Sequence, residues 1–233
     1  MVSVNISKIT SLDNYQVNEA YKMLRTNVQF CGSDIKVIAV TSCTPNEGKS
    51  SVSFNLACSM AEAGKKVLCI DADLRKSVMV GRYRISKPVK GFTHYLSGQC
   101  EFEDVLCSTN IDNLYMVFSG PVTPNPAELL ERNHFKDLVA RVRDDYDYII
   151  VDTPPLGSVI DGAIVARECD GIVFVMESNA ISYKFAQRVV GELEKTECRI
   201  LGTVLNKVKI SKKGFYGKYY GKYYGKYYGH EYK

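Results

Sequence analysis

Residues 37–51 read VIAVTSCTPNEGKSS, and this stretch decides the fold of the chain. Its first five residues, Val37 to Thr41, are apolar or small and form the pattern of a short buried strand. A turn-rich segment follows, and the run from Ser51 to Ala63 then has the composition of a helix. The stretch therefore predicts a strand, a loop and a helix in direct succession.

The loop ends in Gly48-Lys49-Ser50, which are the last residues of a Walker A sequence. In such a loop the backbone N–H groups surround phosphate oxygens, the lysine neutralises them and the hydroxyl binds Mg²⁺. The N-terminus of the following helix adds its positive end. The consensus has a glycine where this chain has Cys43, so the match is incomplete. The residues expected to contact a nucleotide here are Cys43, Thr44, Pro45, Asn46, Glu47, Gly48, Lys49, Ser50 and Ser51.

Two more stretches place carboxylates at the end of a buried-strand pattern: KVLCIDAD at residues 66–73 and YIIVDTPP at residues 148–155, which has the Walker B form. Ligand-binding groups in open α/β sheets gather at the C-terminal ends of strands, so we expect these acids beside the phosphate loop. Like charges this close need a cation, and Mg²⁺ is the expected one. The expected metal ligands are Ser50, Asp71, Asp73 and Asp152.

Strand and helix patterns alternate along the rest of the chain. Further strands are expected at residues 114–118, 171–177 and 200–206, and helices at residues 15–30, 127–143 and 183–195. Residues 1–14 are expected to be a weakly structured lead-in, and residues 74–112 to be less regular apart from a short amphipathic piece at 92–96. The alternation predicts an α/β fold of the P-loop NTPase type, with a doubly wound, mostly parallel sheet and helices on both faces.

This order suggests three parts: an N-terminal helical segment (1–35), a P-loop domain (36–210) and a flexible tail (211–233). Asn206 ends the last expected strand, where it could face a nucleotide base.

The bulk composition is that of a soluble globular protein, with 45% hydrophobic and 24% charged residues. We expect neither a membrane-spanning helix nor a signal peptide, because the first residues are polar and no apolar run is long enough. The eight cysteines are scattered singly without a C-x-x-C pair, which favours reduced thiols. The protein is therefore expected in the cytoplasm.

The C-terminal tail is the least ordinary part of the sequence. Residues 215–230 repeat a four-residue unit as FYGK, YYGK, YYGK and YYGH. A glycine in every unit argues against a stable helix. Residues 211–233 carry six lysines and one glutamate, so the rest of the chain, with 24 basic and 25 acidic residues, is nearly neutral. The tail holds half of the 16 tyrosines: Tyr216, Tyr219, Tyr220, Tyr223, Tyr224, Tyr227, Tyr228 and Tyr232.

Taken together, these segments resemble the bacterial tyrosine kinases, P-loop enzymes that control capsule and exopolysaccharide export. The resemblance rests on SCTPNEGKSS (42–51), VLCIDADLRK (67–76), YIIVDTPP (148–155), the proline-rich loop SGPVTPNPAELL (119–130) and, most specifically, the tyrosine cluster. It implies ATP and Mg²⁺ as cofactors and autophosphorylation of the tail tyrosines between subunits. It also implies that Lys49 and Ser50 bind the phosphates and the metal, that Asp71 or Asp73 accepts the tyrosine proton, and that Asp152 positions the metal.

The resemblance also implies partners. Glu19, Lys22 and Arg25 are similar to the family's ring-forming motif E-x-x-R-x-x-R, with Lys22 in place of the first arginine. Lysine keeps the charge but loses the bidentate fork of arginine. The implied assembly is a ring homo-oligomer, an octamer in this family. The other implied partners are a transmembrane adaptor of the polysaccharide co-polymerase type, which would hold the kinase at the inner face of the membrane, and a cognate tyrosine phosphatase.

Two other classes of protein are compatible with parts of the sequence. A switch ATPase of the MinD/ParA type would share the loop, but Thr44 stands where partitioning ATPases carry an extra lysine. A nucleic-acid-binding module would stack tail tyrosines on bases and track phosphates with lysines. The kinase interpretation is preferred, and no nucleic-acid partner is expected. Direct lipid binding by the Lys/Tyr tail is an alternative to the adaptor.

Overall fold

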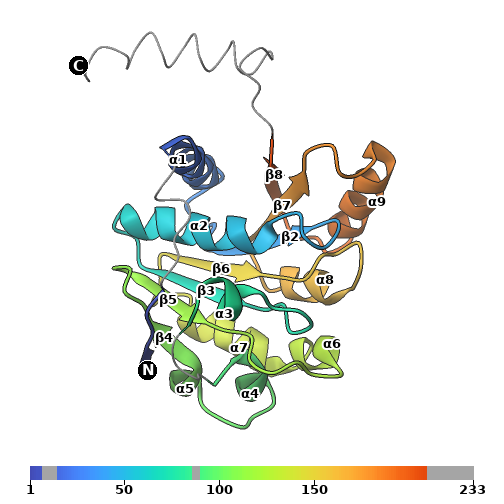
Figure 1. The fold of residues 1–233 in the computed structure, drawn as a ribbon. Helices are drawn as coiled ribbons and strands as arrows, with labels where there is room; N and C mark the ends of the chain where they lie inside the picture. The colour runs from blue at the N-terminus through green and yellow to red at the C-terminus, as the bar shows by residue number, and fades with distance from the viewer. Residues whose placement is uncertain (7–14, 86–89, 209–233) are drawn as a thin grey trace, which may run out of the picture.

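One mostly parallel sheet forms the centre of the computed structural model, which describes residues 1–6, 15–85 and 90–208 (Figure 1). The eight strands of this described part lie in the order β1-β4-β5-β3-β6-β2-β7-β8. Neighbouring strands pair in parallel, except that β4 and β5 are antiparallel. The strands are β1 (Val2–Ser3), β2 (Val37–Ser42), β3 (Val67–Asp71), β4 (Leu106–Ser108), β5 (Leu114–Val117), β6 (Tyr148–Asp152), β7 (Gly171–Glu177) and β8 (Ile200–Asn206).

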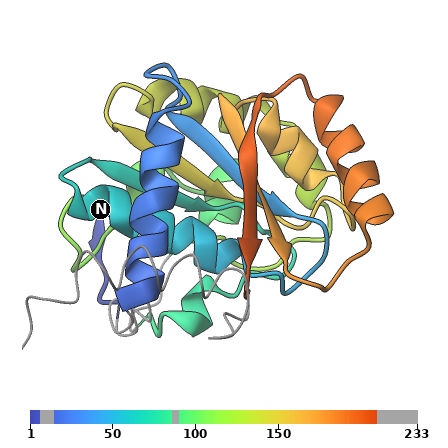
Figure 2. The same cartoon turned by 90° about the horizontal axis from the view of Figure 1, so that it is seen from above.

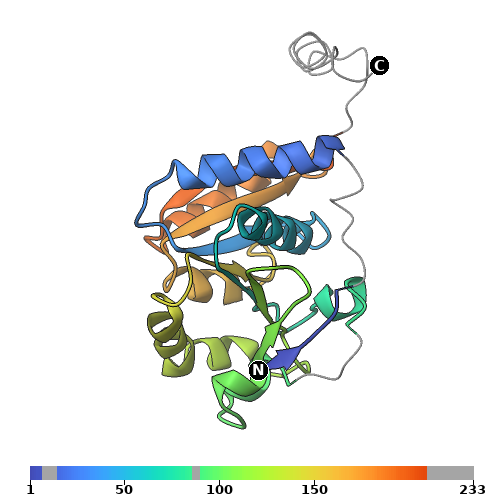
Figure 3. The same cartoon turned by 90° about the vertical axis from the view of Figure 1, so that its left-hand side faces the viewer.

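Helices cover both faces of this sheet (Figures 2 and 3). Their bounds are α1 (Tyr15–Gln29), α2 (Lys49–Glu62), α3 (Met79–Arg82), α4 (Phe92–Leu96), α5 (Phe102–Val105), α6 (Pro126–Leu130), α7 (Asn133–Val142), α8 (Asp161–Ala166) and α9 (Tyr183–Glu194). Buried side chains of α1 to α3 share one hydrophobic cluster and those of α4 to α9 share the other. The predicted doubly wound, mostly parallel α/β fold is confirmed.

The central strand β2 shows why the sheet must be covered twice. Ile38 and Val40 belong to the cluster under α2, whereas Val37 and Ala39 belong to the cluster on the opposite face. Every residue of β2 is buried. A parallel strand with both faces covered needs such a continuous apolar run, which is the pattern that its sequence shows.

The register of the strands brings the C-terminal ends of three strands together. Asp152 at the end of β6 lies opposite Val40 of β2 on one side and opposite Asp71 of β3 on the other. Because all three strands are parallel, their C-terminal ends meet at one edge of the sheet. The loop after β2 and the acids of β3 and β6 therefore share this edge, which we call the carboxyl edge.

The helix expected over residues 127–143 is instead two helices, α6 and α7, separated at Arg132, whose backbone is extended (φ −67°, ψ 153°). In one continuous helix Leu130 and Phe135 would point about 140° apart. Both side chains are buried in the same cluster. The break lets both reach the core, which a single straight helix does not allow.

Two segments are more ordered than expected. In the predicted lead-in, Val2–Ser3 pairs with β4, and Val4 and Ile6 are buried. The rest of that lead-in, residues 7–14, lies outside the described residues. The less regular segment 74–112 contains α3, α4, α5 and β4, because apolar residues spaced along it reach the core. Those buried residues include Met79, Phe92, Phe102 and Val105.

Two further expectations concern membrane-spanning helices and the cysteines. None of the helices described is long and apolar enough to cross a bilayer. All eight cysteines lie in the described part and all are free, as the sequence predicts.

Candidate nucleotide-binding and catalytic site

The loop between β2 and α2 has the backbone of a phosphate-binding loop. Gly48 lies in the left-handed region (φ 96°) directly before Lys49, the first residue of α2. A side chain at Gly48 would place its Cβ 2.1 Å from Nδ2 of Asn206, at the end of β8. Glycine suits this position both for its backbone conformation and for the close approach of the Asn206 side chain.

We expect Gly48→Ala to weaken Mg-ADP binding by at least about tenfold, since either the loop or Asn206 must shift. Gly98→Ala is the matched control, because Gly98 also has a positive φ (74°) but has no atom within 4 Å of the position that a Cβ would take. Both variants should lose about 1–2 kcal/mol of stability from left-handed strain. Calorimetric titration with Mg-ADP separates the two effects, and equal affinities for the two variants would contradict the assignment.

Cys43 fits the place of the first consensus glycine without strain. Its side chain is fully buried and its φ is not positive. The Cys43 carbonyl oxygen lies 2.3 Å from the position that a Cβ on Gly157 would take. The residue that must be a glycine for close backbone packing at this point is therefore Gly157. Burial raises the pKa of the Cys43 thiol to about 12, so the thiol stays protonated at neutral pH.

Lys49 is the centre of the site. Its Nζ lies 2.9 Å from Oδ2 of Asp73 and 3.8 Å from Oδ2 of Asp152. Burial opposes the charge of this ammonium, but the carboxylates of Asp152 and Asp73 outweigh burial and raise the pKa of Lys49. Lys49 therefore stays protonated. Its positive charge also interacts with a third acid, Asp71.

One ammonium cannot balance three buried carboxylates. Asp71 and Asp152 are fully buried, and Asp73 is 5% exposed. Burial and the neighbouring Asp152 raise the pKa of Asp71 to about 7. Burial also raises the pKa of Asp152, although Lys49 partly offsets it. The site is therefore short of positive charge, which a proton or a bound cation can supply.

The acids are held by hydroxyl groups. Ser77 donates to Oδ2 of Asp71, and Ser53 Oγ donates to Oδ1 of Asp152 over 2.9 Å. Oδ2 of Asp152 is buried and accepts no hydrogen bond from the described residues. A carboxylate oxygen left in this state fits a metal ion or its water.

Within the described residues no three His, Cys, Asp or Glu side chains form a ready-made metal site. The carboxylates beside Lys49 are oxygen ligands of the kind that Mg²⁺ takes, usually one or two at a time with phosphates and waters completing its shell.

The loop after β3 is fixed by a pair that the sequence analysis missed. Arg75 donates from Nε and Nη2 to the two carboxylate oxygens of Asp161 in α8, over 2.8 and 2.9 Å. Asp161 is fully buried. This bidentate pair connects the loop that carries Asp73 to the far side of the site. No motif marks Asp161, which is 86 residues away from Arg75 in the chain.

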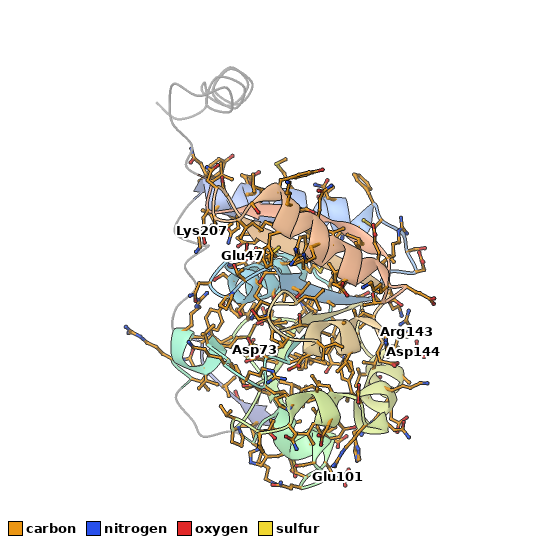
Figure 4. The ribbon with its side chains drawn as sticks, turned by 90° about the vertical axis from the view of Figure 1, so that its right-hand side faces the viewer. Glu47, Asp73, Glu101, Arg143, Asp144 and Lys207 are labelled. Carbon is orange, nitrogen blue, oxygen red and sulfur yellow. The ribbon has the colours of Figure 1, made fainter. Side chains whose placement is uncertain are left out.

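On the other side of the loop, Asn206 and Glu47 make the contacts. Asn206 Nδ2 donates to the Glu47 carbonyl over 2.8 Å. The buried Glu47 carboxylate accepts from the backbone N–H of Thr44 (2.6 Å) and of Glu177 (3.3 Å). Figure 4 shows Glu47, Asp73 and Lys207 toward one edge of the molecule, with Arg143 and Asp144 toward the opposite edge. Asn206 thus contacts the phosphate loop itself, and the sequence missed Glu177 and Lys207.

The candidate oligomerisation residues lie on α1. Lys22 pairs with Glu19 over 2.8 Å. Arg25 is partly buried and donates to the carbonyl of Ser59 in α2 over 2.6 Å. This bond holds Arg25 against α2, because α1 packs across α2 at this point. The eight tail tyrosines, Tyr216 to Tyr232, lie outside the described residues.

The fold and this loop define a class, that of the P-loop nucleotide-binding proteins. Residues 35–205 match the family model described as an AAA domain.

Known proteins narrow the class. The tyrosine-protein kinase CpsD of Streptococcus agalactiae is 42% identical over 206 residues, which cover 88% of this chain and 90% of that protein. The kinase domain of the Escherichia coli tyrosine kinase ETK superposes with a TM-score of 0.77 at 28% identity, covering 91% of this chain and 93% of that domain. The chain belongs to the bacterial tyrosine-protein kinases, and it is a phosphotransferase acting on protein tyrosine.

The predicted resemblance is therefore confirmed. The septum site-determining protein MinD of Pyrococcus horikoshii shares the fold, with a TM-score of 0.66 at 23% identity over 76% of this chain and 72% of that one. A likeness at this identity concerns the fold alone, so the switch-ATPase alternative is less favoured than the kinase.

Proposed function

We propose that this kinase uses ATP and Mg²⁺ to phosphorylate its own tail tyrosines between subunits, and that it thereby regulates capsule or exopolysaccharide polymerisation and export. The observation that carries the proposal is the buried group of three carboxylates around Lys49, beside the phosphate loop. The strand β8 ends against the same loop, and the tyrosine-rich tail follows it in the sequence.

The position of each residue in the site suggests its role in catalysis. Lys49 would leave Asp73 and move onto the β- and γ-phosphates, while the N–H groups of the loop bind phosphate oxygens. Ser50 and Asp152 are the first candidates to hold Mg²⁺, and Asp71 and Asp73 are further candidates. The metal, when bound, neutralises charge that develops on the transferring phosphoryl group. Oδ2 of Asp152, which accepts no hydrogen bond from the described residues, supports this assignment.

The proton of the acceptor tyrosine needs a base. Asp71 is the better candidate, because a pKa near 7 suits a general base at neutral pH and Ser77 orients its carboxylate. Asp73 remains the alternative, although it pairs with Lys49 in this structure. The tyrosine hydroxyl would lose its proton to this carboxylate, its oxygen would bond to the γ-phosphorus, and the bond to the leaving ADP would break.

Transfer between subunits requires an assembly, which we propose to be a ring homo-oligomer, an octamer by family resemblance. The segment 1–35 is the proposed contact, with Glu19 and Lys22 more available than Arg25, which is bonded to α2. Helix α1 and the residue after it also expose Tyr15 (68%) and Phe30 (82%), as a surface that meets a second copy would.

Two further partners complete the proposal. A transmembrane adaptor of the polysaccharide co-polymerase type would hold the kinase at the inner face of the cell membrane, and a tyrosine phosphatase would reverse the modification. Both rest on the family to which the chain belongs.

A mixing experiment tests the proposed function. Wild-type protein is incubated with Mg-ATP and ¹⁵N-labelled Lys49→Met protein, whose mass identifies it as the acceptor. We expect several phosphates on the labelled chain, mapped to Tyr216–Tyr232. Phosphate on the wild-type chain alone would indicate transfer within one chain. ATP hydrolysis without a mass increase on either chain would favour the switch ATPase.

A further inference from the structure

The last described residues of the chain are bonded to the phosphate loop. Lys207 directly follows β8, and its Nζ donates to the carbonyl of Asn46 over 2.6 Å and to Oε2 of Glu177 over 2.8 Å. Asn46 is at the tip of the phosphate loop, and Glu177 ends β7. We call Asn206 and Lys207 the tail root, because the tyrosine repeats begin at residue 215.

The tail root orients two consecutive peptide units of the loop. Lys207 binds the carbonyl of Asn46, and Asn206 binds the carbonyl of Glu47. In a trans peptide the N–H of the next residue points opposite to the carbonyl. The N–H groups of Glu47 and Gly48 therefore point away from the tail root. Successive N–H groups turned to one side are the arrangement that binds a phosphate.

The backbone on both sides of this contact is in an uncommon conformation. Asn46 has φ 69° and Lys207 has φ 55°, both in the left-handed region. Asparagine tolerates this region, but lysine has no local hydrogen bond that favours it. A residue held in this region persists when its surroundings fix it, and the Lys207 side chain is fixed by its bonds to the loop and to β7.

We propose that Lys207 is a positioning residue for the phosphate loop and that it couples nucleotide binding to the placement of the tail root. The second half of this proposal rests on the tail being the acceptor. A nucleotide bound to the N–H groups of the loop fixes the same peptide units whose carbonyls the tail root binds. Binding at the loop therefore holds the tail root in place, and loosening the tail root weakens binding.

Mg-ADP titration of three variants tests the first half. Lys207→Met removes both hydrogen bonds, and we expect it to bind Mg-ADP about three- to tenfold more weakly, the scale of partly exposed charge-assisted bonds. Lys207→Arg keeps the charge and donors and should bind as wild type does. Lys195→Met is the matched control, because Lys195 pairs only with Glu192 among the described residues, on the surface of α9 (2.7 Å).

Hydrogen exchange tests the coupling. Mg-ADP should slow amide exchange over residues 200–208 in wild type and in Lys195→Met, and this slowing should be lost in Lys207→Met. Should Lys207→Met unfold, Glu177→Gln weakens the same bridge and should show an intermediate loss. Unchanged affinity in Lys207→Met, or weaker affinity with the slowing of exchange retained, would overturn the proposal. Neither measurement depends on phosphate transfer. The affinities and exchange rates would therefore still test the role of Lys207 if the autokinase proposal failed.

Discussion

Lys49→Met protein will incorporate roughly 10³-fold less phosphate than wild type during incubation with Mg-ATP, because a positioned cation at the transferring phosphates contributes on this scale. Methionine keeps most of the length and the apolar stem of lysine but removes the ammonium that lies between Asp73 and Asp152. The variant therefore loses attraction for the phosphates and also leaves the acids less neutralised.

Intact mass spectrometry over a time course measures this effect directly. Lys195→Met is again the control, since it removes the lysine that follows α9 and pairs with Glu192, and it should incorporate phosphate as wild type does. Thermal unfolding must accompany the assay, because an unfolded variant would also lose activity. A folded Lys49→Met protein with more than about a tenth of wild-type incorporation would place the essential cation elsewhere.

Asp71→Asn should stabilise the metal-free protein while it abolishes most phosphate transfer. The pKa of Asp71 rises from 3.8 in the unfolded chain to about 7 in the folded protein. Between these values the folded state holds a proton that the unfolded state has released, so the free energy of unfolding falls as pH rises from 4 to 7. By linkage the loss reaches at most about 4 kcal/mol above pH 7. Asparagine cannot ionise and avoids this cost.

Thermal unfolding in EDTA at pH 8 and pH 5 measures the stability effect. At pH 8 the Tm of Asp71→Asn should exceed that of wild type by at least about 5 °C, and the difference should shrink at pH 5. Mg²⁺ should reduce the difference at pH 8 by stabilising wild type. Phosphate transfer should fall at least about 10²-fold if Asp71 is the base. Asp144→Asn, at a side chain 97% exposed, should change neither quantity. Equal Tm values at pH 8 would show that Asp71 ionises without cost.

The fold could be predicted from the sequence wherever burial requires a regular pattern of apolar residues. Strands covered on both faces have continuous apolar runs, and β7, whose first five residues are buried, has the predicted bounds. The edge strand β8 also has the predicted bounds, although none of its residues is fully buried. The break between α6 and α7 could not be predicted, because it depends on Leu130 and Phe135 both reaching the same hydrophobic cluster in the folded chain. The two-residue strand β1 was missed because its pairing with β4 is a contact between residues about 100 apart in the chain.

The candidate site also has a part that the sequence predicts and a part that it does not. Parallel strands bring their C-terminal ends together, so the meeting of Lys49 with Asp73 and Asp152 could be predicted from local motifs. The residues that hold those groups could not. Ser53 and Asp152 are 99 positions apart, and Lys207 and Asn46 are 161 apart. Such contacts have no spacing rule, and only the folded chain brings them together.

The direction of the last strand decides how far the proposed tyrosine acceptors lie from the phosphate loop. Because β8 runs parallel to β7, the chain leaves the sheet at the carboxyl edge. In the opposite direction it would leave about 20 Å away, the length of the strand. The residues from Val208 to Tyr216 can span at most about 30 Å. In the proposed ring, an acceptor tethered inside the assembly has an effective concentration in the millimolar range. For Tyr216 to reach a neighbouring subunit, that subunit's phosphate loop must therefore lie within about 30 Å of the point where the tail leaves the sheet.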